Sequence, residues 1–424
     1  MEFTTTEKTI FIQIASYRDP ELKNTIADCL AKAKNPARLR FGICWQNNKE
    51  DLHDDISNYL FDSRFRIIDI DHTFSRGACW ARNLTQMLYQ NEDFFLQIDS
   101  HTRFVKDWDE KILKIWYELN DEKAMLTAYP ASFKPEQPES EWINGRPSTF
   151  SIFRLNENSY IPHVKPIPFP NGTPEKPYRV AHVAAGLMFA RGKANREVLY
   201  DPNMYFFGEE PSLAIRYFTH GYNLYCPHET IAFHYYSREE SPKNWNDRKD
   251  HQEMIKITNE RFANLVGLKK TLNLQEYGLG AERTLQDFVQ YSGIDFEKKV
   301  IHDDTVLGKE LPCSNSPEGW EFKDIKFNKT VTWDSSKVIE CDDITFYGMF
   351  LCDQNRFAVY RKDLSPEEYK ACIEEGGNSN IAKYKMDAEY RSKNSDTLHY
   401  LMIWPFSKSK LWIGQVYLPL STID

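Results

Sequence analysis

Two residues with metal-binding side chains, Asp99 and His101, end the apolar stretch FFLQIDSH (94–101). If this stretch is a β-strand that continues to residue 101, both side chains point to the same side of the sheet. A carboxylate and an imidazole together suit a borderline divalent ion such as Mn²⁺, whereas Mg²⁺ prefers a shell richer in oxygen. In the alternative interpretation Asp99 caps a turn and His101 is solvated, because so short a motif is common. The pair predicts a metal site only if a further ligand joins it.

His234 is the best candidate for that further ligand. It follows the apolar residues of TIAFHYYSR (230–238), so it also lies at the expected end of a strand. His220 lies at the expected end of a helix and His228 follows a proline in a turn, so both are less well placed. A lone histidine after a strand is usually structural, and the assignment therefore depends on the site at Asp99.

Glu209 and Glu210 form an acidic pair in MYFFGEEPS (204–212), between a glycine and a proline. In the structural interpretation, acidic residues in a first helical turn complement the helix dipole. In the functional interpretation, the glycine lets the backbone approach a ligand closely, and a carboxylate is aimed at a sugar or an acceptor hydroxyl. The residues alone leave both interpretations open.

Two arginines, Arg76 and Arg82, flank the sequence GACWA. Arg76 precedes an expected helix start, where free backbone N–H groups and arginine side chains favour phosphate. Arg82 follows Trp80 by two positions, so it is expected to face away from the apolar stripe that Trp80 and Leu84 define. The alternative for both arginines is a solvated surface position.

Alternating strand and helix patterns in the first third of the chain position these residues. Short apolar runs predict strands at 9–16, 39–45, 65–71 and 94–100, with amphipathic helices between them. Strands separated by helices form βαβ units, so the expected fold class is α/β with a Rossmann-like, mostly parallel sheet. In such sheets ligands gather at the carboxyl ends of the strands.

The pattern changes in the later parts of the chain. Residues 131–180 are rich in proline and polar side chains and are expected to form long irregular loops. After residue 300, β-rich segments joined by polar turns predict a separate, mainly antiparallel β domain at 305–424, which follows a first domain at 1–300. One helix is expected inside the β domain, with Ser365 as its N-cap and a proline and a glutamate in its first turn.

Composition and charge restrict the function and the compartment. The net charge of −9 and the absence of a long basic run exclude nucleic acid as an expected partner. No apolar run is long enough to span a membrane, and the N-terminus lacks the pattern of a secretory signal. The eight cysteines form no CxxC pair, which favours reduced, buried thiols over a disulfide framework. We therefore expect a cytoplasmic protein, in which Asn-x-Thr sequences are not glycosylation sites.

Seven blocks of the sequence, in this order, resemble a known family. The blocks span residues 10 to 296 and read IFIQIASYRDPELKNTI, NPARLRFGICWQ, SRGACWARNL, FFLQIDSHTRFVKDWDE, FFGEEPSLAIRYFTHGYNLYCP, FHYYSR and YGLGAERTLQDFVQYSGIDF. They are similar to the polypeptide α-N-acetylglucosaminyltransferases (glycosyltransferase family 60), a group that includes a cytoplasmic enzyme modifying hydroxyproline. A more distant similarity is to the polypeptide GalNAc-transferases, which share a D-x-H motif, a later metal histidine and a glycine–glutamate segment.

The resemblance implies an A-type glycosyltransferase domain and assigns roles to individual residues. Asp99 and His101 match the D-x-H metal motif, and His234 matches the third ligand. Residues implied at the nucleotide-sugar donor are Ala15, Ser16, Tyr17, Arg18, Arg76, Arg82, Asp99 and Ser100. Residues implied at the reacting sugar are Arg82, Glu209 and Glu210.

The implied function is a retaining, Mn²⁺-dependent transfer of a sugar, GlcNAc by family resemblance, from a UDP-sugar to a hydroxyl on a glycan or a polypeptide. One alternative is a metal-dependent phosphoester hydrolase, which usually needs more carboxylate and histidine ligands. Another is a non-catalytic glycan-binding protein, in which Trp333, Trp404 and Trp412 of the β domain stack on sugars rather than pack in a core. The sequence leaves the oligomeric state open.

Overall fold

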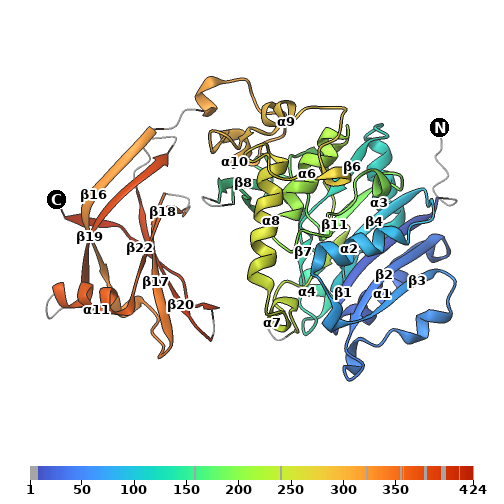
Figure 1. The fold of residues 1–424 in the computed structure, drawn as a ribbon, viewed down its shortest axis with the longest axis horizontal. Coiled ribbons are helices and arrows are strands. Elements are labelled where there is room, and N and C mark those ends of the chain that lie inside the picture. The colour runs from blue at the N-terminus through green and yellow to red at the C-terminus, as the bar shows by residue number, and fades with distance from the viewer. Residues whose placement is uncertain are drawn as a thin grey trace. The chain divides into compact units, whose positions relative to one another are not determined.

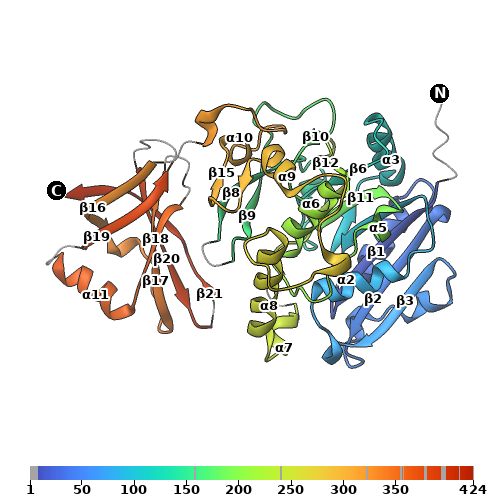
Figure 2. The ribbon, with the colours of Figure 1, turned by 45° about the horizontal axis from the view of Figure 1, so that its top comes forward.

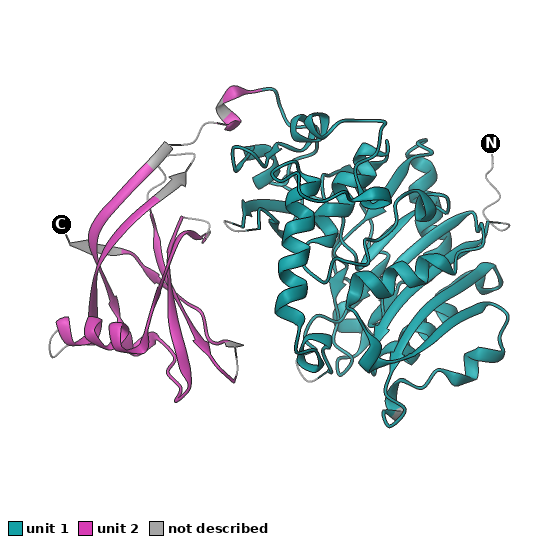
Figure 3. Cartoon of the chain, viewed as in Figure 1, with its two compact units in different colours: residues 1–315 teal, residues 316–424 magenta. Residues whose placement is uncertain are grey.

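Alternating strands and helices of the first 315 residues build a mixed eight-stranded sheet with helices on both faces. The computed structural model describes residues 8–423 apart from 157–158, 239–240, 321–322, 354–355, 357, 377–379, 393–397 and 410. The chain forms two compact units, residues 1–315 and 316–424 (Figure 3). The division lies later than the expected boundary at 300–305 because α10 (Asp303–Val306) packs against β8 (Thr149–Leu155) of the first unit.

The central sheet has the strand order β10-β12-β6-β11-β4-β1-β2-β3. Its strands are β1 (Ile10–Tyr17), β2 (Leu39–Asn47), β3 (Phe65–Asp71), β4 (Phe94–Asp99), β6 (Ala124–Thr127), β10 (Tyr178–Arg179), β11 (Leu187–Arg191) and β12 (Asn223–Cys226). The pairs β4–β1, β1–β2, β2–β3 and β6–β12 are parallel, whereas β11 pairs antiparallel with both β4 and β6. The expected α/β class with a parallel-rich sheet is confirmed, with β11 inserted in the opposite direction at its centre.

The core occupies both faces of this sheet because side chains along each strand alternate between the faces. On β1, Ile12 and Ile14 belong to one buried cluster and Phe11 to the other. The first cluster is covered by α1 (Leu22–Lys32) and α3 (Trp108–Glu118). The second is covered by α2 (Ala78–Met87), which lies across β1 and β2, and by α6 (Glu209–Thr219) (Figures 1 and 2).

The first unit also contains short strands and helices outside the central sheet. The strands are β5 (Thr102–Phe104), β7 (Ala131–Ser132), β8, β9 (Pro162–Ile167), β13 (Ala232–His234), β14 (Ile294–Asp295) and β15 (Val300–Ile301). The helices are α4 (Glu139–Trp142), α5 (Ala194–Glu197), α7 (Asn244–Asp247), α8 (His251–Leu265), α9 (Leu285–Ser292) and α10. Residues 131–180 are therefore not irregular loops throughout, because β8 and β9 pair as an antiparallel hairpin.

Helix α2 presents a different face to the core from the one that its apolar residues predict. Met87 is 70% exposed, and Trp80 is only half-buried. The buried face carries Arg82, Asn83 and Gln86, whose polar groups have partners: the Asn83 amide donates to the carbonyl of Tyr200, and Gln86 bonds the segment 195–200. The buried face of α2 therefore carries hydrogen-bonded polar residues instead of the expected apolar stripe. Arg82, which was expected to face away from the core, points inward.

The second unit is antiparallel throughout its described strand pairs. One sheet has the order β19-β16-β23, and the other has β18-β17-β20-β21 with β22 paired to β20. The strands are β16 (Lys323–Asp334), β17 (Ile344–Cys352), β18 (Ala358–Leu364), β19 (Ile381–Ser392), β20 (Tyr400–Ser407), β21 (Leu411–Trp412), β22 (Val416–Pro419) and β23 (Ser421–Ile423). The mainly β class of this unit is confirmed.

One helix and two aromatic clusters complete the second unit. The predicted helix is α11 (Pro366–Glu375), and Ser365 and Glu368 form the capping box expected from the sequence. Trp333 lies in the buried core, as the packing alternative predicts. Trp404 and Trp412 belong to a separate, partly exposed aromatic cluster. Among the described residues of both units, no helix has the length and apolar character needed to cross a membrane.

Candidate active site

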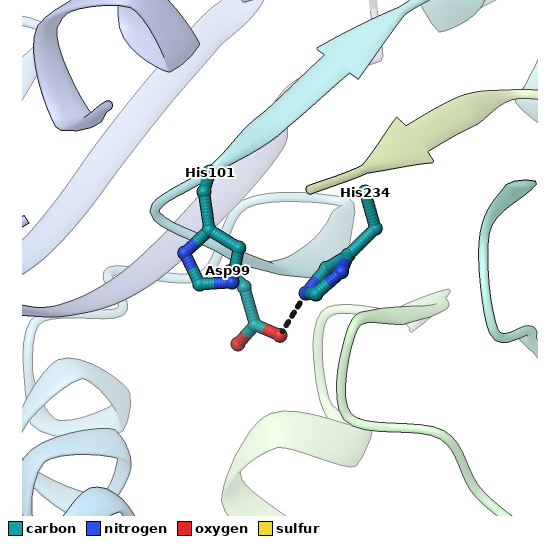
Figure 4. A group of neighbouring side chains, drawn as sticks. All are labelled: Asp99, His101 and His234. Atoms are coloured by element: carbon teal, nitrogen blue, oxygen red, sulfur yellow. Dashed lines mark hydrogen bonds and ion pairs between the residues drawn. The ribbon is translucent and has the colours of Figure 1, made fainter. Parts of the chain in front are cut away.

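The carboxyl edge of the central sheet brings the three predicted metal ligands together. Asp99 is the last residue of β4, and His234 is the last residue of β13, which pairs with β5. The strand does not continue to His101 as expected; the chain bends after Asp99 and returns as β5. In each of the three residues one potential ligand atom lies within 4.8 Å of those of the other two (Figure 4).

The ligand atoms are held in a setting that suits a divalent cation. The Nε2 atom of His234 lies 3.1 Å from Oδ2 of Asp99, and the imidazoles of His101 and His234 lie edge to face with ring centroids 4.5 Å apart. Burial lowers the pKa of His101 to about 4, so the ring is neutral at pH 7, the form that binds metals. Two imidazoles and one carboxylate fit a borderline ion such as Mn²⁺.

Asp19, which no sequence motif marked as a site residue, fixes one of these candidate ligands. Its Oδ2 atom lies 2.8 Å from Nδ1 of His101 and accepts hydrogen bonds from Ser100 and Arg238. Burial alone would raise the pKa of Asp19, but His101 and Arg238 hold it well below its ordinary value. Its position directly after the implied nucleotide-binding stretch 15–18 was the available sequence signal.

Arg82 joins the metal ligands to the acidic pair. Its guanidinium donates to Oδ1 of Asp99 at 3.0 Å and to Oε1 of Glu209 at 3.4 Å. The side chain is only 9% exposed. Burial opposes ionisation of Asp99, but a hydrogen bond with His234 and the charge of Arg82 hold the pKa of Asp99 well below its usual range. Asp99 is therefore a carboxylate at every physiological pH.

The two glutamates differ in their partners although they are adjacent in the first turn of α6. Glu210 accepts hydrogen bonds from the Tyr129 hydroxyl at 2.6 Å and from the backbone N–H of Ala185 at 2.8 Å. Oε2 of Glu209 is buried and has no hydrogen-bond partner among the residues that the structure describes. Burial and the neighbouring carboxylate raise the pKa of Glu209, whereas His182 and Tyr129 lower that of Glu210 against the effect of burial.

A cleft with a volume of about 340 Å³ opens onto these groups. Asp99, His234, Arg82, Glu209 and Glu210 all line it. The other lining residues were not predicted from the sequence; they are Tyr129, Pro130, Pro162, His163, Val164, His182, Ala185, Gly186, Phe206, Phe207, Pro211 and Tyr236. Most of them come from segments 129–130, 162–164 and 182–186, where no motif marks them. His220 and His228, the weaker candidates, are not among its lining residues.

The residues implied at the nucleotide lie at the same edge of the sheet. Ala15, Ser16 and Tyr17 end β1, and Arg18 follows with a left-handed φ of 47°. The Tyr17 hydroxyl donates to Asp247 of α7 at 2.6 Å.

The guanidinium of Arg18 pairs with both Asp51 and Asp247. Ser100 is buried against Asp19, and Arg76 is an exposed residue two positions before the start of α2.

The chain is similar to one protein family and to several solved structures. The model of the family "Glycosyltransferase (GlcNAc)" matches residues 9–60 and 53–298. Among solved structures, the chain is similar to GalNAc-T7 with UDP, GalNAc and Mn²⁺, at 12% identity and a TM-score of 0.49 over 98% of this chain and 79% of that one. S. aureus TarS 1–349 in complex with UDP-GlcNAc matches at 11% identity and a TM-score of 0.38 over 63% of this chain and 69% of that one. No curated protein matches the chain.

Proposed function

This chain belongs to the GlcNAc glycosyltransferase family, and we propose that it transfers N-acetylglucosamine from UDP-GlcNAc to a hydroxyl group with retention of anomeric configuration and dependence on Mn²⁺. The observation that carries the proposal is the convergence of Asp99, His101 and His234 beside the unpartnered carboxylate oxygen of Glu209. The acceptor hydroxyl belongs to a glycan or a polypeptide, and we propose a cytoplasmic location.

Asp99, His101 and His234 would hold the cation, which, when bound, neutralises the charge that develops on a departing nucleoside diphosphate. Asp99 is ionised and His101 is neutral, so neither ligand needs to lose a proton before binding. Because the Asp19 carboxylate accepts a hydrogen bond from Nδ1–H of His101, Nε2 is the nitrogen available to the ion.

The end of β1 and the start of α2 would bind the nucleotide. Ala15 to Arg18 lie at the carboxyl edge of the sheet, where ligands of α/β folds gather. Arg76 precedes the first turn of α2, whose free N–H groups favour phosphate. Ser100 lies between two of the metal ligands in sequence and contributes through Asp19 rather than directly.

Glu209 is the residue that we place against the donor sugar. Its free Oε2 atom is a buried acceptor whose desolvation is uncompensated, so a sugar hydroxyl that donates to it gains a full hydrogen bond. A carboxylate there also stabilises positive charge that develops at C1 of the sugar. Arg82 holds Glu209 and Asp99 at a fixed separation, and Glu210 positions the start of α6 through Tyr129 and Ala185.

The test is binding of UDP with Mn²⁺. Together they are expected to raise the melting temperature of the wild-type protein, and Asp99→Ala is expected to abolish the shift. Asp109→Asn is the matched control, because Asp109 is a buried carboxylate that pairs with Arg38 at the amino edge of the sheet. Absence of a shift in the wild-type protein contradicts the proposal.

A second measurement tests the type of reaction and the identity of the transferred sugar. Mass spectrometry of products from a panel of UDP-sugars is expected to show addition of GlcNAc. Release of UDP only in the presence of an acceptor separates a transferase from a phosphoester hydrolase. Transfer of a different sugar would agree with the proposed metal site but would show that the donor is not UDP-GlcNAc.

A further inference from the structure

An exposed aromatic cluster borders the cleft on the side of α6. Phe206 and Phe207 line the cleft, and their ring centroids lie 4.4 Å apart. The ring of Trp245, on α7, lies 5.6 Å from that of Phe206. Phe207 is 74% exposed and Trp245 is 42% exposed. We refer to Phe206, Phe207 and Trp245 as the aromatic platform.

Phe207 occupies a conformation that folding alone does not favour. Its φ of 68° is in the left-handed region, which is costly for a bulky residue that is not glycine. The ring is mostly in solvent, so core packing does not offset that cost. The next residue is Gly208, the N-cap of α6, and Glu209 follows. The strained backbone therefore places an exposed ring next to the glutamate of the candidate active site.

Helix α7 attaches the third ring of the platform to the implied nucleotide site. Asn244 donates to Oγ of Ser75 at 2.9 Å and accepts from the hydroxyl of Tyr205 at 2.7 Å. Asp247, one turn away, accepts from Tyr17. Trp245 is on the same short helix as these two residues, so α7 connects Phe206 with the expected nucleotide position.

We propose that the aromatic platform is the acceptor subsite and that the acceptor is a saccharide, whose pyranose ring stacks its C–H face on these rings. This inference rests on the proposed transferase function. Aromatic rings offer flat apolar area at low entropic cost, and a pyranose combines one apolar face with a hydroxylated edge. The edge would face the polar cleft lining, which includes Glu209, His182 and His163.

The strand that borders the cleft favours a saccharide over an extended peptide. A peptide that binds by strand addition needs backbone N–H groups on the edge that it meets. β9 carries Pro162 and Pro166, which have no N–H to offer. β13 is paired on both sides, with β5 and β7. Among the described residues that line the cleft, polar and charged side chains include those of Arg82, Glu209 and His182.

In the transfer, the acceptor oxygen forms a bond to C1 of the donor sugar while the bond from C1 to the phosphate oxygen breaks. UDP leaves with that electron pair, and the proton of the acceptor hydroxyl passes to the departing phosphate oxygen. The platform takes no part in these bond changes. Its role is to hold the acceptor ring within reach of C1, so its loss raises the acceptor KM more than it lowers kcat.

The experiment measures transfer from UDP-GlcNAc to p-nitrophenyl pyranosides and, in a separate arm, to a hydroxyproline-containing peptide. Phe207→Ala is expected to raise the KM for the preferred pyranoside between about threefold and tenfold, as loss of one aromatic contact implies. Phe207→Tyr keeps the ring and is expected to restore the wild-type KM. Phe61→Ala is the matched control, because Phe61 is 94% exposed and does not line the cleft.

Each outcome decides the inference. Transfer to a pyranoside with a KM that depends on the ring at position 207 supports it. Transfer to the peptide alone, transfer to neither acceptor, or a pyranoside KM unchanged in both Phe207→Ala and Trp245→Ala overturns it. The rise in melting temperature of the wild-type protein with UDP and Mn²⁺ tests the proposed function separately. Failure of the acceptor proposal can therefore be distinguished from failure of the proposed donor site.

Discussion

Oδ2 of Asp19 and Nδ1 of His101 lie 2.8 Å apart, and both side chains are buried. The same oxygen accepts from Arg238, four residues after the metal-ligand candidate His234. One carboxylate therefore fixes the orientation of one candidate ligand and holds the segment that follows another. Carboxylates in this position typically set the tautomer and orientation of a metal-binding imidazole.

Asp19→Asn is expected to weaken Mn²⁺ binding between about tenfold and a hundredfold, the range seen when such supporting groups are lost. The amide keeps the size of the side chain but does not hold the tautomer of His101 that leaves Nε2 free. Titration of Mn²⁺ in the presence of UDP, followed by electron paramagnetic resonance, measures the affinity. Asp109→Asn again controls for loss of a buried carboxylate; equal affinities for both variants and the wild type would refute the role.

Substitutions of Glu209 and Glu210 are expected to have different effects, the first on catalytic activity and the second on stability. Glu209→Gln should lower kcat by at least about a hundredfold. Because burial and Glu210 raise the pKa of Glu209, its charge costs stability at pH 7, and the variant should melt at the same temperature as the wild type or higher. Glu210→Gln disturbs bonds with Tyr129 and Ala185 and should lower stability by about 1–3 kcal/mol. Parallel thermal melts and initial rates check both; the reversed pattern would exchange the two roles.

The positions of two candidate metal ligands could be predicted because each stands where an apolar strand ends. Asp99 and His234 are the terminal residues of β4 and β13, and local hydrophobic patterns locate strand ends reliably. The helix in the β domain could also be predicted from the sequence, because the capping box at Ser365 is a local signal. Features that depend on neighbouring residues alone could be predicted.

The orientation of α2 and the supporting groups of the site could not be predicted in this way. The buried face of α2 holds Arg82 and Gln86, whose partners at 99, 195 and 209 are distant in the sequence. Asp19 meets His101 only after β1 and β4 have paired. Tertiary contacts decided these positions, and a rule based on apolar spacing assigns such polar residues to solvent.

The N-cap of α11 gives a test of the second unit. Oγ of Ser365 accepts from the backbone N–H of Glu368, and the Glu368 carboxylate accepts from the N–H of Ser365. Ser365→Ala should reduce the stability of this unit by about 1 kcal/mol, the usual value of a cap. Ser365→Thr keeps the acceptor and should restore most of it. Urea unfolding followed by circular dichroism measures both, and an unchanged midpoint in the alanine variant would contradict the expectation.

His163 predicts how the first unit responds to acid. Burial lowers its pKa to about 4, from an ordinary value of 6.5. The unfolded chain therefore takes up this proton before the folded protein does, so protonation of His163 destabilises the fold progressively as the pH falls from about 6.5 to about 4. Above that window the residue has no such effect.

His163→Gln removes this proton uptake and should lose less stability than the wild type on acidification. The expected result is a difference in melting temperature, variant minus wild type, that grows between pH 7.5 and pH 5. Other titrating groups are common to both proteins and cancel in the difference. His53→Gln is the control, because His53 is an exposed histidine on the loop after β2. A difference that is constant with pH would mean that the folded protein accepts the proton at His163 as readily as the unfolded chain does.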